Sequence, residues 1–227
     1  MGGSLAPGYS NIPVDVGKEP QGPPPLPAKT VEGIVDLVMP LYYTKEQITP
    51  DELVAAKKLW RMIVNNQSEY FFEFQRELRK AGGTPPELCG EYLLNLWVLR
   101  LLDIHPQAKP LFEKVDRTKM RIHFLSMITM LIDCAGDDPE KFKKSLQGLV
   151  KAHGVIGVRS CEFGIGAEIM MYCVKKCLGP KICTPAVMFV FAKFFSRILE
   201  IMLPLSIQQE MAGNITNRRP EGPLVKH

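Results

Sequence analysis

The chain has 227 residues, of which 46% are hydrophobic, so it can bury the core of one to one and a half domains. Its 28 basic and 24 acidic residues are spread along the chain and give a net charge of +4, without the basic stripe or the motifs of a nucleic-acid-binding protein. No stretch has the length of a membrane span, and the N-terminus lacks a secretory signal. We therefore expect a cytoplasmic protein that contacts neither nucleic acid nor the membrane interior.

The N-terminal segment differs in composition from the rest of the chain. Residues 1–45 are rich in Gly and Pro, which predicts a disordered extension that contributes little to stability. Within it, PPPLPAK places Pro24, Pro27 and Lys29 in a PxxPx+ arrangement, which in polyproline II conformation fits an SH3-type partner. A solvated linker is the alternative. Residues 33–43, GIVDLVMPLYY, are apolar enough to dock on the domain as a short helix broken by a proline.

Helical patterns begin near Ile48. Thr49, Pro50 and Glu52 form a capped helix start, and apolar residues then recur on one face. Further helices are predicted over residues 68–80, 87–103, 120–135, 138–153, 161–178 and 184–202. Period-two alternation is almost absent. The sequence therefore predicts an all-α domain over 46–206, followed by a polar C-terminal tail over 207–227.

The six cysteines suggest neither a disulfide framework nor a zinc site. They stand at positions 89, 134, 161, 173, 177 and 183, and no pair has the two-residue spacing that zinc sites prefer. Cys173 and Cys177 are the closest pair, one helical turn apart. We predict buried structural thiols.

One histidine lies on the apolar face of a predicted helix. Asp138 can cap this helix and Pro139 fits its first position. Apolar residues then recur at steps of three and four, at Phe142, Leu146, Leu149 and Val150. The same spacing turns His153 inward. Such a histidine is either a core residue bound to a backbone carbonyl or the ligand of a cofactor, and the helix alone leaves both open.

Several motifs in order resemble those of the globin family. DIHPQAKPLF places Pro106 six residues before Phe112, LVKAHGVIGV follows, and two long apolar helices close the pattern. The resemblance covers about residues 48–204, and EFGIGAEIMMYCVKKCLGPK is similar to the neuroglobin-like branch. It implies a globin-like helical fold that binds haem b, with His153 as the proximal iron ligand. The segment YFFEFQRELRKAGGTPP would be an insertion after the first helix.

The resemblance also implies which side chains contact the cofactor. Leu149 would cover the same porphyrin face as His153, Val158 and Phe163 would line its far edge, and Phe112 would stack from the distal side. His123 is the possible distal ligand, with Met127 one turn later on the buried side. Phe124 or Met120 is the alternative distal residue. The complete set is Phe112, His123, Met127, Leu149, His153, Val158 and Phe163.

The implied function is reversible binding of O₂, with NO and CO as further diatomic ligands, for transport, storage or sensing. No catalytic residue is implied. NO dioxygenation is an alternative that needs an external reductase, because no flavin or nicotinamide domain is evident. A haem-free helical interaction module is the alternative from another class. His105, next to Pro106, is expected to cap a helix or to face solvent.

Overall fold

A computed structural model describes residues 25–112, 115–136 and 138–213. Within these ranges the chain is helical and contains no strand, which confirms the predicted all-α class. The elements are α1 (Ala28–Val38), α2 (Pro50–Val64), α3 (Glu69–Lys80), α4 (Cys89–Ile104), the 3₁₀ helix η1 (Pro106–Leu111), α5 (Arg117–Cys134), α6 (Pro139–Val155), α7 (Ser160–Leu178) and α8 (Pro185–Met211). Residues 1–24 of the predicted extension and 214–227 of the predicted tail lie outside the described residues.

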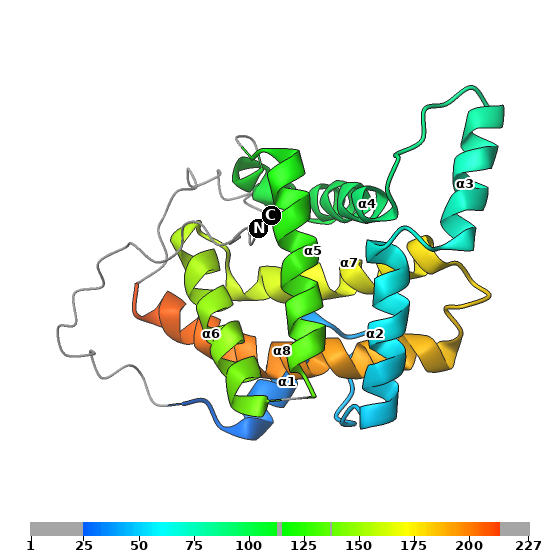
Figure 1. Ribbon diagram of the computed structural model, residues 1–227. Coiled ribbons are helices and arrows are strands. Elements are labelled where there is room, and N and C mark those ends of the chain that lie inside the picture. The colour runs from blue at the N-terminus through cyan, green and yellow to red at the C-terminus, as the bar shows by residue number, and fades with distance from the viewer. Residues whose placement is uncertain (1–24, 113–114, 137, 214–227) are drawn as a thin grey trace, which may run out of the picture.

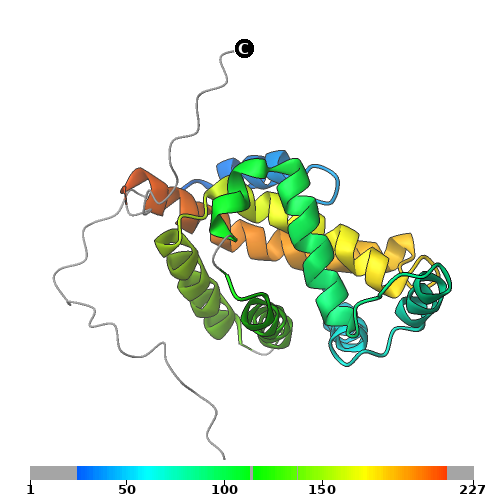
Figure 2. The same ribbon diagram turned by 90° about the horizontal axis from the view of Figure 1, so that it is seen from above.

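The two longest helices form the centre of the fold. α7 and α8 pack along each other, and α2, α5 and α6 cross them in Figure 1. α4 packs mainly on α7, and α3 stands at one end of the molecule, where it contacts α7. Figure 2, seen from above, shows α2 and α5 nearly end-on, on one side of the α7–α8 pair. The segment predicted as an insertion thus forms a helix at the periphery.

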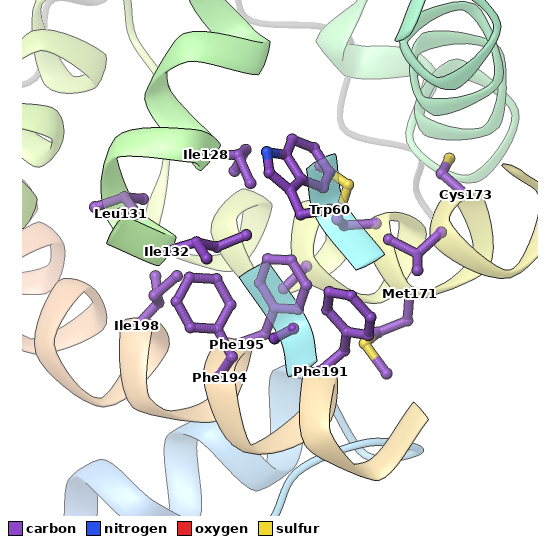
Figure 3. Close-up of a cluster of buried hydrophobic side chains, with 14 of the residues drawn as sticks. Trp60, Ile128, Leu131, Ile132, Met171, Cys173, Phe191, Phe194, Phe195 and Ile198 are labelled. Atoms are coloured by element: carbon purple, nitrogen blue, oxygen red, sulfur yellow. The ribbon is translucent and has the colours of Figure 1, made fainter. Parts of the chain in front are cut away.

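Aromatic side chains fill the core where α2 and α5 meet α8. Trp60 lies close to Phe191, Phe194 and Phe195 in Figure 3, and all four are almost completely buried. The Trp60 indole N–H donates to the Thr129 hydroxyl at 2.8 Å, so its one polar atom is satisfied. This packing joins the first helix of the predicted domain to its last helix.

The start of α2 confirms the predicted cap, and one of its residues also forms an ion pair with α8. The Glu52 amide donates to the Thr49 hydroxyl at 3.3 Å, and the Thr49 amide donates to the Glu52 carboxylate at 2.8 Å, which is a capping box. The hydrogen bonds from Thr49 and from Lys193 lower the pKa of Glu52. Lys193 is buried in α8, and its ammonium lies 2.9 Å from Glu52 and 3.1 Å from Glu46. The buried charge is therefore paired twice.

The packed body begins earlier than residue 46. α1 rests on α7 and α8, and its Val35 and the following Met39 are fully buried. This confirms that residues 33–43 dock as a short helix that ends before Pro40. The expectation that residues 1–44 contribute little to stability therefore does not hold for α1, because Val35 and Met39 on its apolar side enter the core.

The position of α1 also changes the interpretation of the proline-rich motif. Pro27 precedes α1 with extended backbone angles, φ −58° and ψ 143°, but Lys29 already belongs to the helix. Lys29 is therefore not in the polyproline II conformation on which the SH3-type interpretation depends, and the SH3-type partner stays a prediction. Pro24 lies outside the described residues.

Five of the six cysteines are buried free thiols, as predicted, and Cys161 is exposed. Burial raises the pKa of Cys173 to about 12 and that of Cys183 to about 11. These thiols stay protonated at neutral pH, which is typical of structural cysteines.

Over the ranges given above, no helix combines the length and hydropathy that crossing a bilayer requires.

Candidate functional site

Local signals in the sequence determine where α6 begins and ends, and they therefore determine the position of His153 along this helix. The Asp138 carboxylate accepts the amides of Glu140 and Lys141 at 3.1 and 3.0 Å, and Pro139 occupies the first helical position. The helix stops at Val155, just before Gly157, whose φ of 86° favours glycine. His153 thus lies in the last turn, as the sequence predicted.

The His153 ring is held in one orientation. Its Nδ1 lies 2.9 Å from the Leu149 carbonyl oxygen one turn earlier. Because a carbonyl only accepts, the Nδ1 atom carries the proton and Nε2 of the neutral ring carries the lone pair. Burial lowers the pKa of His153, and the Leu149 hydrogen bond opposes this in part. The favoured state is a neutral imidazole with a donor nitrogen available to a metal.

Apolar residues of α6 and α7 surround this ring. The Phe163 ring lies 5.4 Å from that of His153, centroid to centroid. Leu149 is partly buried against the core, one turn before His153. The partly buried Val158 donates its amide to the His153 carbonyl at 3.0 Å. The structure therefore places near His153 the three residues that the resemblance implied for the same face of the cofactor, Leu149, and for its far edge, Val158 and Phe163.

A second group consists of three aromatic rings, from α4, from α5 and from the residue that follows η1. The Trp97 ring lies 5.2 Å from Phe124 and 6.3 Å from Phe112. The Trp97 indole N–H donates to the carbonyl of Gly166 at 3.0 Å, and the ring packs so closely that a Cβ at Gly166 would lie 3.2 Å from it. Trp97 was not among the predicted site residues. Its neighbours come from distant parts of the chain, so they are visible only in the three-dimensional structure.

The two groups border the same stretch of α7. Phe163, beside His153, and Gly166, beside Trp97, are three residues apart and therefore adjacent on one helix face. Helix α7 thus carries an apolar strip with the histidine at one end and the aromatic group at the other. This strip is the candidate functional site.

Helix α5 presents Phe124 rather than His123 to this aromatic group. His123 is exposed, whereas Phe124 is partly buried and its ring is tilted at 50° to that of Trp97. Met120 and Met127 are partly buried, and Ile128 is buried. His123 was expected to be the inward residue, but the structure turns Phe124 inward instead.

His105 occupies the cap position between two helices, as expected. It ends α4, where its amide donates to the Leu101 carbonyl at 2.7 Å, and it precedes η1. Its side chain makes no cap hydrogen bond; instead, its Nε2 lies 2.8 Å from a carboxylate oxygen of Glu162, which is buried in the first turn of α7. The other Glu162 oxygen accepts the Arg159 amide at 2.8 Å. Glu162 looked like an ordinary first-turn acidic residue in the sequence, and only the approach of α4 and η1 to α7 buries it.

Two open surface hollows lie away from this strip. One, of about 370 Å³, lies over α3 between Phe72 and Arg79, and one of about 530 Å³ lies over the start of α6 near Lys144. Both are lined mainly by charged side chains. In the part of the chain that the structure describes, no three His, Cys, Asp or Glu side chains form a metal-binding group. A haem iron needs only one such side chain, because the porphyrin supplies four ligands.

No protein-family model matches the sequence, and no solved structure matches the fold. The functional argument therefore rests on the residues of the chain itself.

Proposed function

We propose that the protein binds haem b through His153 and reversibly binds O₂ or another diatomic gas. The observation that carries the proposal is the hydrogen bond from His153 Nδ1 to the Leu149 carbonyl at 2.9 Å. It orients the ring and leaves the Nε2 lone pair to a metal, the arrangement that metal-binding histidines share. Bound haem would supply an iron atom that can take a diatomic gas as its sixth ligand.

The side chains near His153 are apolar, as the proposal requires. Phe163 offers hydrocarbon surface beside the imidazole, and Leu149 and Val158 are its partly buried neighbours along the chain. An apolar lining excludes water and keeps the imidazole neutral, which an axial ligand must be. The roles of these residues are to orient the ring and to cover the cofactor.

The order of the helices supports the same proposal. α6, which carries His153, contacts both α5 and α8, and α5 in turn contacts α4. The aromatic group around Trp97 therefore approaches the strip on α7 from α4 and α5, while His153 approaches it from α6. A cofactor on the strip would have the histidine on one side and Phe112 with Phe124 on another.

Titration of the purified protein with haem is the direct test. We expect one haem per chain and a strong Soret band. His153→Ala should lower haem affinity at least about 100-fold, since loss of even an outer partner of a metal ligand costs about 10–100-fold. Absence of a Soret band in the wild type would instead favour a haem-free helical interaction module.

A matched variant separates loss of the ligand from loss of the fold. His153→Gly removes the imidazole and leaves space for a free one. Added imidazole should restore the Soret band of His153→Gly but leave His153→Ala much less improved, with unchanged far-ultraviolet circular dichroism in both. Equal haem affinity in the wild type and both variants would contradict the proposal.

The distal side gives a separate prediction. Because Phe124 rather than His123 lies in the aromatic group, we expect the deoxygenated ferrous protein to show one broad visible band, the sign of a single axial protein ligand. His123→Leu should leave this band unchanged, and Phe124→His should replace it by sharp, split bands. Split bands in the wild type that His123→Leu abolishes would assign His123 as the distal ligand.

A further inference from the structure

The connection between α6 and α7 follows His153 directly. We define the α6–α7 corner as residues Gly154–Arg159. The His153 carbonyl accepts the amides of Ile156 and Val158 at 3.2 and 3.0 Å, so the corner is bonded to the backbone of the histidine itself. Any movement of the corner is therefore transmitted to the last turn of α6.

The last turn of α8 contacts one end of this corner through a glycine. A Cβ atom at Gly154 would lie only 2.7 Å from the side-chain oxygen of Gln209. Gly154 is buried, and its missing side chain allows α8 to approach directly behind His153. The neighbouring turn of α6 is thus in close contact with α8.

The same turn of α8 contacts the other end of the corner through a carboxylate. One oxygen of Glu210 accepts the Ser160 amide, and the other accepts the Ser160 hydroxyl at 3.2 Å. Ser160 is the first residue of α7, where backbone amides lack partners within the helix. An anionic acceptor at a helix N-terminus is stabilising, so Glu210 acts as a cap supplied from a distant part of the chain.

We propose that Glu210 is a positioning residue for His153: by bonding to Ser160 while Gln209 contacts Gly154, the last turn of α8 holds the α6–α7 corner and thereby the angle of the imidazole. This proposal rests on the proposed function for its purpose, since the angle matters when His153 binds iron. The restraint itself belongs to the chain alone.

The identity of Glu210 matters because, among the described residues, its carboxylate is the acceptor bonded to this amide. Glu162 accepts a hydrogen bond from the preceding amide, that of Arg159, and its other carboxylate oxygen lies within hydrogen-bond distance of His105 Nε2. Loss of Glu210 therefore leaves the Ser160 amide without its acceptor. A charge-assisted hydrogen bond of this kind is worth a roughly tenfold or larger change in a local opening equilibrium.

The test compares Glu210→Gln and Glu210→Ala with Glu200→Gln, a matched change in the same helix. Glu200 pairs with Arg197 at 3.6 Å, ten positions before Glu210. In protein without haem, nuclear magnetic resonance would measure hydrogen exchange at the Ser160 amide and the ¹⁵N shifts of the His153 ring. We expect about tenfold faster exchange at Ser160 in Glu210→Ala. In Glu210→Ala we also expect the ¹⁵N shifts of the His153 ring to move toward those of a mixture of the two tautomers. Glu200→Gln should change neither the exchange rate nor these shifts by much.

In protein loaded with haem, the rate of haem loss to an excess acceptor globin and the iron–histidine stretching frequency complete the test. Glu210→Ala should raise the rate about tenfold, within the range for outer partners of metal ligands, and should move the frequency. Faster Ser160 exchange with an unchanged His153 ring, rate and frequency would make Glu210 a helix cap only and overturn the proposal. Unchanged exchange would overturn the contact itself. If the wild type binds no haem, the proposed function fails, and the ring shifts in the haem-free protein still decide the positioning role.

Discussion

Removal of residues 1–44 is expected to lower the melting temperature by about 10 °C, whereas removal of residues 1–24 should leave it nearly unchanged. The longer deletion takes away Val35 and Met39, which are fully buried. Burial of one such side chain contributes about 1.5–3 kcal/mol, so two contribute about 3–6 kcal/mol. In a protein of this size each kcal/mol corresponds to about 2–4 °C.

Thermal unfolding of the two truncated proteins, followed by circular dichroism at 222 nm beside the full chain, would measure the difference. The shorter deletion is the control, because its Gly- and Pro-rich sequence predicts no packed role. It also leaves the hydrogen bond from the Thr44 amide to the buried Ser196 hydroxyl, at 3.1 Å, in place. Equal melting temperatures for both deletions would contradict the docking of α1.

Gly164→Ala should destabilise the protein by about 1–3 kcal/mol, the usual cost of forcing extra volume into a packed interior. Gly164 lies in α7 where α1 ends against it. A Cβ at this position would lie 2.5 Å from the Cβ of Val38 and 2.7 Å from its carbonyl oxygen. Backbone cannot rotate away as a flexible side chain can, so α1 would have to move. Urea unfolding at constant m-value would report the loss.

Gly148→Ala is the matched control, since Gly148 also lies inside a helix but has no neighbouring atom within 4 Å of an added Cβ. There the same change should stabilise by about 0.5–1 kcal/mol, because alanine favours a helix over glycine. In the protein lacking residues 1–44, Gly164→Ala should lose its penalty, since Val38 is gone. A penalty that persists there would show that the clash lies elsewhere.

Local signals made most of the helices predictable. Thr49 with Glu52, and Asp138 with Pro139, are caps whose hydrogen bonds involve residues two or three positions away, so the sequence contains both partners. The inward position of His153 follows in the same way from the spacing of α6. Its bond to Leu149 spans a single turn, which is why this part of the candidate site could be predicted.

Contacts between distant segments were not predictable. Glu162 is buried by His105, 57 positions away, and Ser160 is capped by Glu210, 50 positions away. Trp97 meets Gly166 across 69 positions. A sequence pattern gives the face of a helix but not the helix that covers it. The exposure of His123 has the same origin, because one residue of rotation in α5 decides whether position 123 or 124 points toward Trp97.

The docking of α1 on α7 and α8 has a consequence for synthesis on the ribosome. The first described helix packs on the last two, so its partners are made only after residues 160–211 have been synthesised. At about 5–20 residues per second, the interval between residue 38 and residue 211 is on the order of tens of seconds. During that time Val35 and Met39 have no core to enter. The nascent protein therefore exposes a short amphipathic segment to chaperones, and this segment can dock only after α8 has left the ribosome.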